Sequence, residues 1–219
     1  MPSRRLPQQA VGPIWLPLIA AGLLGLAGYF GPWVSHRAAG LAVSGLDLGE
    51  YVKFIPQVMS GQIAVRREIF YFPLFAGSLM ASLLASRRSL PRFLRILLGL
   101  GAIPLALALL PPAWSPTTLL LPEFRLQSAA LIFCLAMVPA VILTRYLPDR
   151  LVLGLIAVLA IPAAVLPTWG FLEVRAPIAA LYRQPLRLGW GFWANLIGFL
   201  FVAFWALAQA LTRPAQRRD

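Results

Sequence analysis

The stretch LVLGLIAVLAIPAAVLPTWGF, residues 151–171, runs for 21 residues without a charged side chain. A transmembrane helix needs about 20 mostly apolar residues to cross the hydrocarbon core of a bilayer. The sequence therefore predicts an all-α, polytopic membrane helix bundle with about six transmembrane helices, organised as a single membrane domain over residues 1–219. The six expected spans are residues 12–34, 69–86, 93–111, 124–144, 151–171 and 190–212.

The overall composition agrees with this class. Of the 219 residues, 60% are hydrophobic and only 12% are charged, whereas soluble domains carry about 45–50% apolar and about 25% charged residues. The first block follows Arg4 and Arg5, as in a signal peptide, but it is long enough to span and lacks a small-x-small cleavage pattern. We expect it to remain as an uncleaved first helix.

The charges between the blocks predict an orientation. With the N-terminus inside, the inner segments hold 11 basic and two acidic residues, and the outer segments hold eight basic and five acidic residues. The inner loops are also short, and Arg87, Arg88, Arg92 and Arg95 cluster in one of them, as the positive-inside rule requires. We therefore expect a protein of the cell (inner) membrane with both termini cytoplasmic.

The net charge of +12 would indicate nucleic-acid binding in a soluble protein. Here the basic residues flank apolar blocks and form no long tract. They are better explained as topology signals and lipid contacts, so no nucleic-acid partner is expected.

Three outer loops are expected between the spans, at residues 35–68, 112–123 and 172–189. Ser44 and Asp47 have the spacing of a capping box, and apolar residues follow at helical spacing until Pro56 ends the pattern at Ile55. This predicts a short amphipathic helix that lies on the outer membrane surface or caps the bundle. A second short helix is expected over residues 177–184.

Acidic residues and one histidine of the outer segments are the weak candidates for a catalytic site: Asp47, Glu50, Glu173 and His36. If they converge, they supply an acid–base pair or metal ligands. The simpler explanation for Asp47 is the helix cap, and for Glu50 it is an ion pair with Lys53. No motif for nucleotide, metal or nucleophilic chemistry accompanies them, so no metal and no cofactor is expected.

Three outer arginines form a basic set that could hold a lipid phosphate: Arg175, Arg183 and Arg187. The alternative is that these long side chains reach from the apolar region to the interface and bind nothing specific.

Within the expected spans no Asp, Glu, Lys or His lies near the middle. Proton- and ion-coupled carriers usually keep such a residue, so a proton-driven carrier is disfavoured. The polar residues that remain are mild, and Asn195, Ser78 and Ser82 are expected to serve helix packing. Pro104, Pro139 and Pro162 are explained equally by a kinked seam around a cavity and by the general frequency of proline in membrane helices.

Two functions fit these patterns. The first is a non-enzymatic subunit of a larger membrane complex, permease-like or accessory, whose partners are the lipid bilayer and either other membrane subunits or further copies of the same chain. The alternative is a membrane-embedded enzyme that acts on a lipid or lipid-linked substrate at the outer face.

Overall fold

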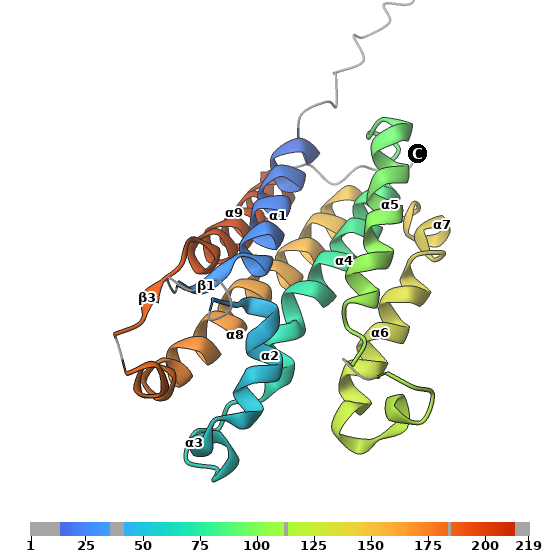
Figure 1. The fold of residues 1–219 in the computed structure, drawn as a ribbon. Coiled ribbons are helices and arrows are strands. Elements are labelled where there is room, and N and C mark those ends of the chain that lie inside the picture. Colours follow the sequence, from blue (N-terminus) through green and yellow to red (C-terminus); the bar gives the residue numbers. More distant parts are fainter. Residues whose placement is uncertain (1–13, 36–41, 112–113, 184, 213–219) are drawn as a thin grey trace, which may run out of the picture.

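The computed structural model describes residues 14–35, 42–111, 114–183 and 185–212 (Figure 1). It is 76% helical, which confirms the all-α class. In the described part of the chain, three helical segments are long and apolar enough to cross a membrane: Arg67–Ala85, Asp149–Tyr182 and Trp190–Thr212. The expected number of six such helices is therefore not confirmed, because the other apolar helices are shorter.

The principal helices, in chain order, are α1 (Trp15–Phe30), α4 (Phe72–Ala85), α5 (Arg92–Leu107), α6 (Arg125–Met137), α7 (Val141–Thr144), α8 (Asp149–Tyr182) and α9 (Trp190–Thr212). The shorter helical pieces are α2 (Gly45–Tyr51), η2 (Val52–Phe54), α3 (Pro56–Met59), η3 (Arg67–Tyr71), η4 (Thr118–Leu120) and η5 (Pro122–Phe124).

Helices α1 and α9 pack with their backbones almost in contact. A Cβ atom on Gly198 would lie 2.4 Å from the backbone nitrogen of Gly25, and one on Gly28 would lie 2.2 Å from that of Asn195. Small residues permit this close approach, which is a common way for membrane helices to associate. Helix α8 packs along the other side of α9 and buries an alanine-rich face against the bundle core.

Helix α8 corrects the expected boundary of the fifth span. The segment predicted as 151–171, with a separate helix at 177–184, is one helix of 34 residues, about 51 Å long at 1.5 Å per residue. The first part of the expected outer loop 172–189 is therefore helical. The helix continues past its charged residues because Phe171, Val174 and Ile178 extend its buried face, and Pro177 is accommodated within it.

A small sheet joins three segments that are distant in the sequence. Strands β1 (Pro32–Ser35), β2 (Val43–Ser44) and β3 (Arg187–Leu188) are antiparallel in the order β2-β1-β3. The sequence did not predict this sheet, because strands of two to four residues are too short for an alternating pattern. Residues 32–34, expected at the end of the first span, belong instead to β1.

The short helix expected after Ser44 is present as α2 and its continuation η2. Its capping box is formed in both directions between Ser44 and Asp47, and the helical run stops at Ile55, which precedes Pro56. Leu48, Val52 and Ile55 are buried in a hydrophobic cluster with Trp33, Phe171 and Phe192. Of the two expected placements, the structure therefore shows the one in which this helix caps the bundle.

The third and fourth expected spans, 93–111 and 124–144, are shorter than predicted. Helix α5 ends at Leu107, and α6 ends at Met137 before the chain turns through residues 138–140 into α7. Helices α5 and α6 have 16 and 13 residues, so they are about 24 and 20 Å long. Pro139 lies in the turn, where a proline interrupts helical hydrogen bonding.

The ends of the helices gather at two opposite ends of the molecule (Figure 1). We call the end that holds residues 86–92 and 145–150, together with the start of α1, the arginine end. The opposite end, which we call the far end, holds α2, α3, residues 114–124 and the last turns of α8, and the sheet packs against it where α1 ends and α9 begins.

Candidate functional site

Asp47, the first of the candidate acids, works as a helix cap at the far end. Its carboxylate accepts hydrogen bonds from the Ser44 backbone nitrogen at 2.9 Å and from the Ser44 hydroxyl at 2.7 Å, and the Asp47 backbone nitrogen donates back to that hydroxyl at 3.2 Å. This arrangement satisfies donors at the start of α2. The structure thus gives the Asp47 carboxylate a local role in α2.

Glu50 is the candidate acid with the richest surroundings. Lys53 donates to one carboxylate oxygen at 2.5 Å, and the hydroxyl of Tyr71 donates to the other at 2.5 Å. The guanidinium of Arg67 lies 3.8 Å from Glu50. Burial raises the pKa of Glu50, but the hydrogen bonds from Lys53 and Tyr71 and the two positive charges outweigh it, so the pKa lies below its ordinary value. Glu50 is therefore an ionised acceptor.

Arg67 connects this cluster to the α6 side of the molecule. It donates to the backbone carbonyl of Glu123 at 2.8 Å and to the side-chain carbonyl of Gln127 at 3.3 Å, and it lies 4.4 Å from the ring centre of Phe124. Tyr71, Arg67 and Gln127 were not predicted from the sequence, because nothing local links residues so distant in the chain. The charged run at residues 66–68 was the only signal.

Glu173, the remaining catalytic candidate that the structure describes, does not join this cluster. Glu173 is exposed on α8, and no hydrogen bond or ion pair links it to Asp47 or Glu50 among the described residues. His36 lies outside the described residues. Among the residues that the structure describes, no three His, Cys, Asp or Glu side chains are grouped so that they could hold a metal ion.

The outer arginines lie around the end of α8. Arg183 is its C-terminal cap, in the left-handed region with φ of 51°, and Arg187 is an exposed residue of β3. Arg175 donates to the carbonyl of Leu186 at 3.4 Å, across the turn between α8 and β3. They share one region, and the described contacts give Arg175 a role in holding that turn.

The polar residues expected at helix interfaces are buried. The Asn195 amide donates to the carbonyl of Gly25 on α1 at 3.2 Å, and Ser78 donates to the carbonyl of Ala102 on α5 at 2.9 Å. Ser82 is also buried, and its hydroxyl has no hydrogen-bond partner among the described residues.

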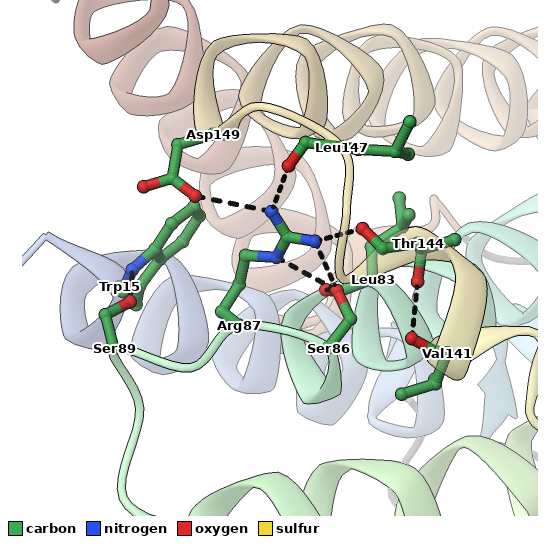
Figure 2. Close-up of polar contacts among 9 residues, drawn as sticks. All are labelled: Trp15, Leu83, Ser86, Arg87, Ser89, Val141, Thr144, Leu147 and Asp149. Atoms are coloured by element: carbon green, nitrogen blue, oxygen red, sulfur yellow. Dashed lines mark hydrogen bonds and ion pairs between the residues drawn. The ribbon is translucent and has the colours of Figure 1, made fainter. Parts of the chain in front are cut away.

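A second polar cluster, at the arginine end, was not predicted from the sequence. Arg87 follows the end of α4 and is only 3% exposed. Its guanidinium donates to the backbone carbonyls of Thr144 and of Leu147, the latter at 2.9 Å, and lies 3.3 Å from the carboxylate of Asp149 (Figure 2). It also donates to the hydroxyl of Ser86 at 2.6 and 2.9 Å. Arg87 therefore ties the end of α4 to the connection between α7 and α8.

The same end is joined to α1 by a second side-chain contact. The indole nitrogen of Trp15, a buried residue, donates to the hydroxyl of Ser89 at 2.8 Å (Figure 2). Trp205 on α9 donates to the carbonyl of Ile14 at 3.0 Å. These bonds fix the residue 86–89 turn against α1 and fix the start of α1 against α9.

Between residues 86–89 and residues 145–149, which line it, the structure contains a cavity of about 390 Å³ with both polar and apolar walls. Arg87 forms a buried wall of the cavity, whereas Arg88 and Arg145 are exposed at it. The guanidinium of Arg145 lies 4.6 Å from the ring centre of Tyr146 and donates to its hydroxyl. The sequence signal for this site is the arginine cluster itself, which predicts topology and general lipid contacts but not a pocket.

Comparisons of the chain with known protein families, with curated proteins and with solved structures found no match.

Proposed function

We propose that this chain is a multi-pass integral membrane protein, with its arginine end on the cytoplasmic side, and that it acts as a non-enzymatic subunit of a larger membrane complex. In this proposal the helices α1, α4, α5, α6 with α7, α8 and α9 all enter the bilayer.

Membrane placement is supported by the apolar side chains that the helices leave uncovered. Within the most apolar 18-residue stretch of each helix, only 44% of the stretch in α8 and 39% of that in α9 is buried within the chain. Large exposed residues such as Val158 on α8 and Phe204 on α9 make up the remainder. In water such continuous apolar surface is rare on a monomer, whereas in a bilayer it faces lipid.

The proposed orientation is supported by the helix ends that gather together. The contacts of Trp15 with Ser89 and of Arg87 with Asp149 hold the start of α1, the α4–α5 turn and the start of α8 at one end. That end carries the dense arginines, which the positive-inside rule assigns to the cytoplasm.

The observation that carries the subunit proposal is the broken, uncovered helix at α6 and α7. Pro139, in the break, is exposed, and Ile142 and Leu143 beyond it are 62% and 71% exposed. In the turn, hydrogen bonds to the carbonyls of Val138 and Pro139 are long, at 3.4 and 3.3 Å. Irregular backbone at membrane depth is tolerated where protein or a water-filled cavity covers it. A partner protein on this face would supply that cover.

The short helices beside the break favour the same conclusion. Helix α6, about 20 Å long, falls short of a hydrocarbon core of about 30 Å. A short helix can be accommodated by bilayer thinning or by association with another protein. Association also fits the exposed apolar side chains of α6, among them Ile132 and Phe133.

The experiment is native mass spectrometry of the particle extracted gently from its own membrane. We expect a defined mass above the 23.9 kDa of one chain, from a different subunit or from further copies. The pair Ile132→Ala with Leu143→Ala removes apolar contacts on the α6–α7 face and should reduce the fraction of the larger particle.

The matched control is the pair Phe204→Ala with Leu211→Ala, which removes equally exposed apolar side chains from α9. It should leave the larger particle intact. A lone chain in the wild type, or equal loss in both pairs, would overturn the assignment to the α6–α7 face.

The alternative function, an enzyme acting on a lipid at the outer face, is favoured by one observation. Tyr71, which donates to Glu50, also lines a largely apolar cavity of about 150 Å³ beside Phe75 and Leu126. An ionised carboxylate that orients a phenol beside an apolar cavity is a candidate proton-transfer pair. If lipid turnover is detected with the purified chain, Glu50→Gln should abolish it, while Glu173→Gln should not; unchanged turnover in Glu50→Gln would exclude this site.

A further inference from the structure

The cavity at the arginine end has a fixed shape, because buried contacts hold both of its walls. One wall is the residue 86–89 turn and the other is residues 145–149. The buried guanidinium of Arg87 bonds to both, and Ser89 is held by Trp15. We call this cavity the arginine pocket. The polar groups of Ser86, Arg87 and Ser89 are therefore positioned before any ligand arrives, which reduces the ordering cost of binding.

The charge of the arginine pocket favours an anion. Its lining contains three arginines, Arg87, Arg88 and Arg145, and one acid, Asp149, so these side chains carry a net charge of +2. Arg87 and Asp149 face each other at 3.3 Å, which leaves the exposed Arg88 and Arg145 to set the potential at the opening. Arginine guanidinium groups match the geometry of phosphate oxygens.

We propose that the arginine pocket binds the phosphate of an anionic phospholipid headgroup. This inference rests on the membrane placement proposed above, and it adds a specific ligand that the subunit proposal does not require. Basic pockets between membrane helices on the cytoplasmic side are sites where anionic headgroups bind.

The position of the pocket indicates a lipid rather than a soluble phosphate as the source. Tyr146 is exposed at its rim, next to Leu147 and Pro148. Tyrosine beside apolar residues at the end of a membrane helix is typical of the headgroup layer.

The test uses the full-length chain in detergent and titrates it with phosphatidylglycerol or with zwitterionic phosphatidylcholine, counting bound lipids by native mass spectrometry. We expect saturable binding of phosphatidylglycerol and not of phosphatidylcholine. The double variant Arg88→Gln with Arg145→Gln should weaken that binding by about 30-fold, given the usual contribution of each basic residue near an anionic membrane surface. Both side chains are exposed, so the fold should persist.

The matched control is Arg66→Gln with Arg125→Gln, which removes two exposed arginines that lie outside the arginine end and should bind as the wild type does. The pair Arg88→Lys with Arg145→Lys keeps the charge and should recover part of the affinity. Equal losses in the two glutamine pairs would show unspecific charge attraction and overturn the proposal.

Inorganic phosphate distinguishes the two sources of the anion. Millimolar phosphate should not displace the bound lipid; complete displacement would show a site for soluble phosphate instead. Failure of the subunit proposal is recognised separately, because the particle mass in the native membrane extract does not depend on the lipid titration.

Discussion

The guanidinium of Arg87 lies 3.3 Å from the carboxylate of Asp149, 62 residues further along the chain. This contact and the bonds from Arg87 to the carbonyls of Thr144 and Leu147 connect the end of α4 to the start of α8. Burial lowers the pKa of Arg87, and the charge and hydrogen bond of Asp149 oppose this only in part, so the pKa lies below its ordinary value.

Arg87→Met should destabilise the protein by about 3 kcal/mol, because two carbonyls and one carboxylate lose their buried partner. Thermal unfolding of the purified chain in detergent, followed by near-ultraviolet circular dichroism, measures the loss. The neighbouring and exposed Arg88 is the control, and Arg88→Met should change stability by less than about 0.5 kcal/mol. Similar effects of the two substitutions would argue against a clamp at Arg87.

Gly198→Ala should separate α1 from α9, since its Cβ would lie 2.4 Å from the backbone nitrogen of Gly25. Forcing apart a well-packed interface costs about 1–3 kcal/mol. The control is Gly154→Ala on α8, where the added Cβ meets nothing within 4 Å and the higher helix propensity of alanine should stabilise by about 0.5–1 kcal/mol. We expect the same unfolding measurement to show lower stability than wild type for Gly198→Ala and higher stability for Gly154→Ala.

Glu50 should make stability depend on pH in the acid range. Because its pKa is lowered in the folded chain, its contribution is present above the ordinary glutamate value of about 4.3 and is lost as the pH falls through the lower folded value. The difference in melting temperature between wild type and Glu50→Gln should therefore be largest near pH 6 and shrink toward pH 3.

Tyr71→Phe provides the comparison for this profile, since it removes one of the hydrogen bonds that Glu50 accepts and keeps the ring. Its stability should vary less with pH than that of the wild type. A constant difference between wild type and Glu50→Gln from pH 6 to pH 3 would contradict the assigned role of Glu50.

Labelling with a membrane-impermeant maleimide tests the orientation. In a Cys134→Ser background, cysteines replace the exposed residues Arg92 and Gln62, which lie at the arginine end and the far end. We expect Gln62→Cys to react in intact cells and Arg92→Cys to react only after the membrane is opened. The reverse pattern would invert the proposed topology.

Local patterns predicted the parts of this fold that depend on neighbouring residues. The capping box of Ser44 and Asp47 and the stop at Ile55 are set by side chains three or four residues apart and by the ring of Pro56. The interruption near Pro139 has a local cause of the same kind, but residues 124–144 were expected as one span, because a kink and the general frequency of proline explained this residue equally. The boundary near Phe171 was wrong, because the charges of Glu173 and Arg175 suggested an end to the helix, while packing of Val174 and Ile178 against the far-end cluster extends it.

The sequence by itself determined that this chain is helical, that its apolar residues lie in long blocks, and where its arginines are concentrated, because these properties depend on composition and spacing alone. The tertiary structure decided that Arg87 bonds to Asp149 and that Asn195 reaches Gly25, 170 residues away. It also decided that Glu50 faces Tyr71 rather than Glu173. Such pairs form only when packing brings distant helix ends together, and no local spacing rule encodes which ends will meet.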